Sequence, residues 1–132
     1  MKILIIGGTG TISSAITRQL AESEHELWLL NRGNRKQEVP ANVKQIIANI
    51  DDEADVLRQI GDTMFDAVCE FIGFVTEQVE RDHRLFAGRT RQYVYISSAS
   101  AYAKPVRNYI INEGTSLCNP HWEYSRNKIA CE

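Results

Sequence analysis

Two side chains near the end of the sequence have the types and spacing that proton-transfer chemistry needs. Tyr124 and Lys128 are four residues apart, so they share one face if the segment is helical. A phenol titrates near ~10, too high for a base at neutral pH, but a neighbouring ammonium lowers its pKa. The pair could therefore act as a general acid and base, although two surface residues of a helix often have the same spacing.

A glycine turn near the N-terminus predicts the binding of a pyrophosphate. Gly7, Gly10 and Ser13 are spaced three residues apart between a short apolar run and a helical pattern. Backbone N–H groups where that helix begins, at Thr11 and Ile12, together with the helix dipole, favour an anion. Gly7 permits the tight turn, Gly10 lets a phosphate approach, and the small Ser13 takes the place of a third glycine. A purely structural turn is the alternative.

The residues after the second apolar run, 27–30, indicate which dinucleotide is bound. A ribose 2′-hydroxyl calls for Asp or Glu there, whereas a 2′-phosphate calls for Arg. The sequence has Asn31 followed by Arg32, with Arg35 and Lys36 close by and no acid before Glu38. This pattern favours NADP as the cofactor and leaves NAD open.

The hydrophobic pattern positions these residues on alternating strands and helices. Predicted strands cover 3–6, 27–30, 43–48, 67–72 and 93–96, and predicted helices cover 11–23, 56–60, 77–86 and a segment from 122 onward. This alternation is typical of an α/β fold, a Rossmann-type doubly wound parallel sheet. Ligands of such sheets bind beyond the carboxyl ends of the strands.

The charges argue against a polybasic binding protein. Fifteen Lys and Arg residues against seventeen Asp and Glu give a formal net charge of −2, so nucleic acid is not the expected partner. One dense group of charges falls on the third predicted helix, where we expect a solvated face. Its members are Glu77, Glu80, Arg81, Asp82 and Arg84.

Length and cysteine usage indicate one domain in a reducing compartment. The chain has 132 residues, and no apolar run reaches the eighteen needed to cross a membrane. Cys69, Cys118 and Cys131 form no CxxC pair, and the three histidines lack metal-ligand spacing, so no metal site is predicted. Reduced thiols and the absence of a signal-peptide core favour the cytoplasm.

Four motifs in order resemble the extended short-chain dehydrogenase/reductases, in the NAD-dependent epimerase/dehydratase group. The glycine turn is the first. Residues 48–52 are similar to the Gly-Asp-x-x-Asp that ends the third strand in this family, with Asn49 in place of the usual Asp. Residues 95–102 resemble the fifth-strand serine motif, and 124–128 match YxxxK. The resemblance covers nearly the whole chain.

The resemblance implies a cofactor surface after the third and fourth strands. The implied contacts are Asn49 and Ile50 at the adenine, and Phe71, Ile72 and Gly73 on the ribose and nicotinamide side. Lys128 would hydrogen-bond the nicotinamide ribose and lower the pKa of Tyr124. Ser98 would contact the substrate oxygen, and Tyr124 would transfer the proton. The substrate class would be a small carbonyl compound or a sugar nucleotide, and reduction, epimerisation and dehydration stay open.

Family members usually continue beyond the point where this sequence stops. We therefore expect residues 1–132 to be an incomplete NAD(P)-binding Rossmann domain that ends just after the YxxxK motif, before the C-terminal substrate region. Apolar surface left by missing strands could drive self-association.

The alternative function is a non-catalytic NAD(P)-sensing or RNA-binding module of the same fold. Arg32, Arg35 and Lys36 slightly favour it. The net charge argues against it, and the intact Tyr124 and Lys128 pair favours an enzyme.

Overall fold

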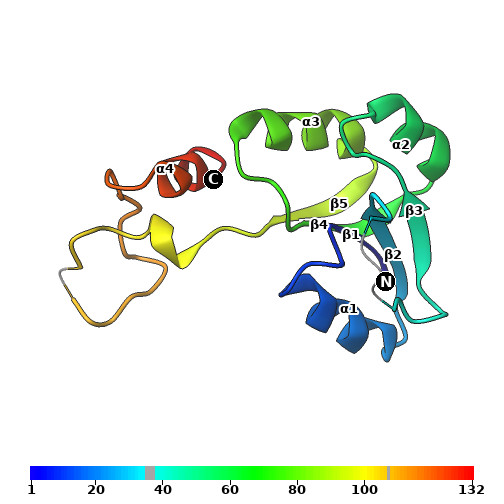
Figure 1. Ribbon diagram of the computed structural model, residues 1–132, viewed down its shortest axis with the longest axis horizontal. Helices are drawn as coiled ribbons and strands as arrows, with labels where there is room; N and C mark the ends of the chain where they lie inside the picture. Colours follow the sequence, from blue (N-terminus) through cyan, green and yellow to red (C-terminus); the bar gives the residue numbers. More distant parts are fainter. Residues whose placement is uncertain (35–37, 107) are drawn as a thin grey trace.

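A five-stranded parallel sheet forms the centre of the computed structural model, which describes residues 1–34, 38–106 and 108–132. The spatial order of the strands is β3-β2-β1-β4-β5 (Figure 1). Their bounds are Lys2–Ile6 for β1, Glu26–Asn31 for β2, Lys44–Ile47 for β3, Phe65–Glu70 for β4 and Thr90–Tyr95 for β5. The predicted parallel α/β sheet is confirmed.

The central strand β1 is apolar throughout its interior because both of its faces are covered. Leu4, Ile5 and Ile6 have no exposed surface, and Ile5 lies opposite Leu29 of β2 and Cys69 of β4. Parallel strands buried on both faces are expected to read as continuous apolar runs rather than as alternating patterns.

Helices cover both faces of the sheet, which makes it doubly wound. The helices are α1 (Ser13–Ala21), α2 (Glu53–Ile60), α3 (Thr76–Phe86) and α4 (Glu123–Ala130), with a 3₁₀ turn at Ala99–Ala101. Ile16 and Leu20 of α1 pack against one apolar cluster, whereas Val56 of α2 and Leu85 of α3 belong to the other. Figure 1 shows α1 on one side of the sheet and α2 and α3 on the opposite side.

The order of the strands reverses at β1. From β1 the chain proceeds through β2 to β3 in one direction, and then crosses back to place β4 on the other side of β1. A crevice is expected where neighbouring crossovers diverge in this way, beyond the carboxyl ends of β1 and β4. The glycine turn and Ile72 lie at this edge.

The prediction of a solvated face on α3 is wrong for two of its five residues. Arg81 is 5% exposed and Asp82 is fully buried. Both side chains lie against the sheet, where Arg81 Nε and Nη2 donate to Asp82 Oδ1 at 3.0 and 2.8 Å. Asp82 lies four residues before the apolar Phe86, so helical periodicity puts both side chains on the inner face of α3. That spacing was the available signal in the sequence.

The described residues between β5 and α4, 96–106 and 108–122, run away from the sheet and have little regular structure (Figure 1). An isolated antiparallel bridge joins Tyr102 to Leu117. Tyr109, Ile110 and Ile111 are exposed in this segment. Among the described residues, no helix has the length and apolar character to cross a membrane.

Candidate functional site

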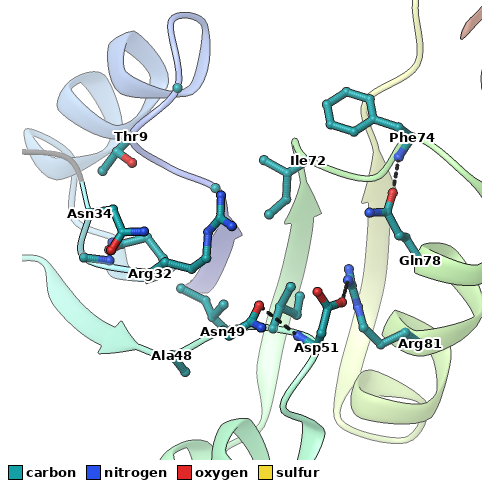
Figure 2. Close-up of a pocket in the computed structure, with 16 residues that line it drawn as sticks. Thr9, Arg32, Asn34, Ala48, Asn49, Asp51, Ile72, Phe74, Gln78 and Arg81 are labelled. Atoms are coloured by element: carbon teal, nitrogen blue, oxygen red, sulfur yellow. Dashed lines mark hydrogen bonds and ion pairs between the residues drawn. The ribbon is translucent and has the colours of Figure 1, made fainter.

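A cleft of about 450 Å³ lies at the carboxyl edge of the sheet (Figure 2). Its walls come from the glycine turn after β1, from 30–34 at the end of β2, from 48–51 after β3 and from the segment that joins β4 to α3. Seven of the twelve residues predicted to contact the cofactor line it, and they are Gly7, Gly10, Asn31, Arg32, Asn49, Ile50 and Ile72. The other five predicted cofactor residues do not line the cleft, and they are Thr11, Ile12, Phe71, Gly73 and Lys128.

Gly7 takes a conformation that other residues rarely adopt. Its φ is +79°, and a Cβ at this position would collide with the side chain of Ile72. Its N–H donates to the carbonyl of Leu30 at 3.0 Å, which ties the turn to the end of β2. The role predicted for Gly7 in the tight turn is therefore confirmed.

Ser13 closes the glycine turn with its hydroxyl. Its Oγ donates to the carbonyl of Gly7 at 2.6 Å and accepts the N–H of Gly10 at 2.9 Å. The side chain is buried, so it takes the space of the third glycine and adds two hydrogen bonds. The N–H groups of Thr11 and Ile12, which precede α1, donate to no acceptor among the described residues. Such free donors at a helix N-terminus suit an anion.

The end of β2 presents polar donors to the cleft. The Oδ1 of Asn31 accepts the N–H of Gly33 at 2.9 Å, while its Nδ2 is buried with no partner in the described part of the chain. Arg32 is exposed, and Figure 2 shows its side chain pointing into the space between Thr9 and Ile72. Arg35 and Lys36, which also supported NADP and the RNA-binding alternative, lie outside the described residues.

Asp51 and Arg81 form an ion pair on the cleft wall that the sequence did not predict. Arg81 Nη1 donates to Asp51 Oδ1 at 2.6 Å (Figure 2). Asn49, two residues before Asp51, is exposed in the cleft, and the neighbouring Ile50 is buried. Asp51 lies in the segment between β3, which ends at Ile47, and α2, on the carboxyl side of the sheet, and that position was the available signal.

Beneath this pair lies a buried acidic cluster. The fully buried Glu70 ends β4, and its Oε2 has no hydrogen-bond partner among the described residues, with Arg81 Nη2 at 3.8 Å. Burial, followed by the charge of Asp82, raises the pKa of Glu70 to about 8. The Tyr93 hydroxyl donates to Asp82 Oδ2 at 2.7 Å, and burial raises the pKa of Tyr93 above its ordinary value.

The raised pKa of Glu70 predicts a stability that falls with rising pH. Between its ordinary pKa of 4.5 and the folded value of about 8, the unfolded chain releases a proton that the folded chain retains. Glu70→Gln mimics the neutral form, so its advantage in unfolding free energy over the wild type should grow through this window. We expect at least ~1 kcal/mol at pH 8, measured by urea denaturation. Glu77→Gln on the exposed face of α3 is the matched control, and parallel pH profiles for all three proteins would contradict the expectation.

Lys128 ties α4 to the ends of two strands. Its side chain is 2% exposed, and its Nζ donates to the carbonyls of Gly73 at 2.7 Å and Ile96 at 2.8 Å. The ammonium also lies 4.6 Å from the ring centroid of Tyr95. Burial lowers the pKa of Lys128 from its ordinary value. The implied cofactor residues Gly73 and Lys128 are therefore in direct contact.

Tyr124 lies on the same helix, as its spacing predicts. The Lys128 Nζ is 5.8 Å from the centroid of its ring. The ring packs against Trp122, with centroids 4.8 Å apart, and against Phe74 of the cleft wall, with centroids 6.1 Å apart. Phe74 thus connects the Tyr124 side chain with the cleft, which Tyr124 itself does not line.

Ser98 and Phe71 lie outside the cleft. Ser98 begins the 3₁₀ turn after β5, where its Oγ accepts the N–H of Ser100 at 3.2 Å. Phe71 packs into the apolar cluster on the α1 side of the sheet. The cofactor role implied for Phe71 and the substrate role implied for Ser98 stay predictions.

A doubly wound parallel sheet with a glycine turn at its switch point defines a Rossmann-type domain. The chain belongs to the NAD dependent epimerase/dehydratase family, whose model matches residues 3–132. This agrees with the resemblance given by the ordered motifs.

Individual relatives share this fold. A UDP-glucose 4-epimerase of Lactobacillus helveticus is 28% identical over an alignment that covers all of this chain and 45% of the relative. A UDP-Glc/GlcNAc 4-epimerase structure from Campylobacter jejuni has a TM-score of 0.83 at 21% identity, covering 98% of this chain and 46% of its own. A UDP-glucose 4-epimerase from Bifidobacterium longum, in complex with NAD+ and UDP, has a TM-score of 0.77 at 19% identity, covering 98% and 46%. The chain thus spans less than half the length of these relatives.

Proposed function

We propose that the protein is an NAD(P)-dependent enzyme that acts on a sugar nucleotide through Ser98, Tyr124 and Lys128. The observation that carries this proposal is the anchorage of α4 at the carboxyl edge of the sheet. The Lys128 Nζ donates to the carbonyl of Gly73. In the sequence, Gly73 stands between Ile72 and Phe74, which both line the cleft. A cofactor in the cleft would therefore extend toward the side chains of α4. The names of the similar epimerases support a nucleotide sugar as the substrate.

Each of the three side chains has a distinct role in this proposal. When bound, the nicotinamide supplies a hydride acceptor or donor. Tyr124 takes the proton of a substrate carbinol or returns it to a carbonyl oxygen. Lys128 keeps a positive charge beside Tyr124, which favours the phenolate. Ser98 holds the same substrate oxygen by a hydrogen bond. Residues 1–132 would form the NAD(P)-binding domain, and the unpaired cysteines support a cytoplasmic location.

The residues at the end of β2 fit a cofactor that carries a 2′-phosphate. The unpartnered Nδ2 of Asn31 needs an acceptor, and the neighbouring Arg32 supplies a cation without a carboxylate at the strand end. We therefore propose NADP, with NAD as the alternative that the complexes of similar structures favour.

Arg32→Ala should separate these two cofactors. Loss of a charge-assisted contact to the 2′-phosphate should weaken NADPH binding by about 10–100-fold and leave NADH binding nearly unchanged. Titration of the protein followed by nicotinamide fluorescence measures both affinities. Arg91→Ala, at an exposed position on β5, is the matched control. Tighter binding of NADH than NADPH by the wild type would overturn the NADP proposal and leave the family assignment unchanged.

The substrate class is tested with UDP-galactose, UDP-glucose and dTDP-glucose in the presence of NADP or NAD. Chromatography of the nucleotide sugars detects an epimer or a dehydrated product. Conversion of any one supports the proposal and identifies the reaction type. No conversion of all three by a cofactor-binding protein that joins these residues to the C-terminal region of such relatives would count against a sugar-nucleotide substrate.

A further inference from the structure

We propose that Asn119 polarises a chain of three serine hydroxyls so that Ser98 presents its proton, and not a lone pair, to the substrate oxygen. This inference rests on the proposed function, because it deepens the role of Ser98. Ser100 and Ser125 are the intermediate links. Neither of them, nor Asn119, was given a role by the sequence motifs.

The amide of Asn119 has only one orientation that satisfies its backbone neighbours. The side chain is 7% exposed. Its Oδ1 accepts the N–H of His121 at 3.2 Å, and its Nδ2 donates to the carbonyl of Ser100 at 2.8 Å. Because a backbone N–H only donates and a carbonyl only accepts, a flipped amide would break both bonds. The second proton of Nδ2 therefore points to Ser125 Oγ, 3.3 Å away.

This fixed donor sets the direction of the next two hydrogen bonds. The fully buried Ser125 Oγ accepts from Asn119, so its own proton goes to Ser100 Oγ at 2.9 Å. Ser100 Oγ has then accepted one bond, and Ser98 Oγ at 2.9 Å is the remaining partner for its proton among the described residues. Each hydroxyl is satisfied when all the protons point from Asn119 toward Ser98.

Ser98 stands at the end of this chain with its proton free. Its Oγ accepts from the hydroxyl and from the N–H of Ser100, the latter at 3.2 Å. Its own O–H is consequently available to an acceptor outside the chain. A donor of this kind stabilises a substrate oxygen while negative charge develops on it, as a carbonyl or alkoxide oxygen requires. The opposite direction would direct the proton of Ser98 to Ser100 and leave only lone pairs for the substrate.

The same hydrogen bonds join three parts of the chain. Ser98 and Ser100 follow β5, Asn119 precedes α4, and Ser125 is adjacent to Tyr124 on α4. Asn119 is therefore a positioning residue, because it acts on Ser98 through the intervening hydroxyls.

Asn119→Asp tests the direction because it replaces the Nδ2 donor by an acceptor of the same size. Ser125 would then donate to the carboxylate, and every proton of the chain would reverse. We expect kcat for UDP-galactose to fall by about 100-fold, the cost of losing one donor to a developing oxyanion, with little change in KM. Activity should recover as the pH falls, because the protonated carboxyl can donate again. Asn112→Asp, at an exposed position with the same change of charge, should keep the wild-type kcat.

Two comparisons keep this inference separate from the proposed function. If Ser98→Ala keeps the wild-type kcat, the proposed role of Ser98 fails. If Ser98→Ala is impaired while Asn119→Asp is not, the role of Ser98 stands and the polarised chain is overturned. Neutron diffraction from the deuterated wild-type protein decides the direction even if a variant misfolds. A deuteron bonded to Ser100 Oγ and pointing to Ser98 supports the inference, and one bonded to Ser98 and pointing to Ser100 overturns it.

Discussion

Tyr124→Phe should lower kcat for UDP-galactose by about 10²–10⁴-fold, because it removes the hydroxyl that transfers the proton. Binding of NADPH or NADH should stay within about twofold of the wild type, since the Tyr124 side chain does not line the cleft and its ring contacts with Phe74 and Trp122 are kept. The measurements are product formation at saturating substrate and a fluorescence titration of each cofactor.

Tyr109→Phe is the matched control for this substitution. The Tyr109 side chain is 92% exposed, so loss of its hydroxyl should leave kcat unchanged. Equal kcat values for the Tyr124→Phe, Tyr109→Phe and wild-type proteins would remove Tyr124 from the reaction. A parallel loss of cofactor binding in Tyr124→Phe would point to a structural role instead.

Arg81→Met should cost about 3–5 kcal/mol of unfolding free energy, because it breaks a buried ion pair by removing one partner. Asp82 would stay fully buried without its two hydrogen bonds from the guanidinium. The cleft would also lose the contact between Arg81 and Asp51, so cofactor affinity should fall as well. The midpoint and slope of urea denaturation give the loss of stability.

Arg84→Met, three residues later on the exposed face of α3, is the control for Arg81→Met. Arg84 pairs with Glu53 of α2 at the surface, where an ion pair contributes between ~0 and 1 kcal/mol. A similar loss of unfolding free energy for both variants would mean that the buried ion pairs of Arg81 stabilise the protein no more than the surface pair of Arg84. A loss below ~1 kcal/mol for Arg81→Met would contradict the ion-pair assignment itself.

Local features of the sequence predicted the sheet and its glycine turn. The continuous apolar run at β1 indicated a strand covered on both faces, and the buried Leu4, Ile5 and Ile6 agree with it. The need for glycine at position 7 was also visible, because a turn between a buried strand and a helix leaves few conformations for the first residue. These properties depend on neighbours within a few positions, so periodicity and residue type suffice to predict them.

The boundaries of the elements were less well predicted. The first helix begins at Ser13 and not at Thr11, because the Ser13 hydroxyl is bonded to Gly7 and Gly10 and holds the preceding residues in the turn. The fourth strand ends at Glu70 and not at residue 72, where the chain leaves the sheet to form the cleft wall. There the backbone N–H of Ile72 donates to the side chain of Glu70. Hydrogen bonds to side chains thus decided both positions.

Only the tertiary structure decided how charged and polar side chains pair across the molecule. Charged residues on a helix usually face water, yet Arg81 is buried because Asp51, thirty positions away, and Asp82 hold its guanidinium. In the same way, Lys128 reaches the carbonyl of Gly73 over 55 positions, and Asn119 reaches Ser100 over 19. The sequence by itself determined the fold and the candidate Tyr124 and Lys128 pair, through local periodicity and spacing. The partners of those side chains depend on how crossovers bring distant segments together, and no local pattern records that.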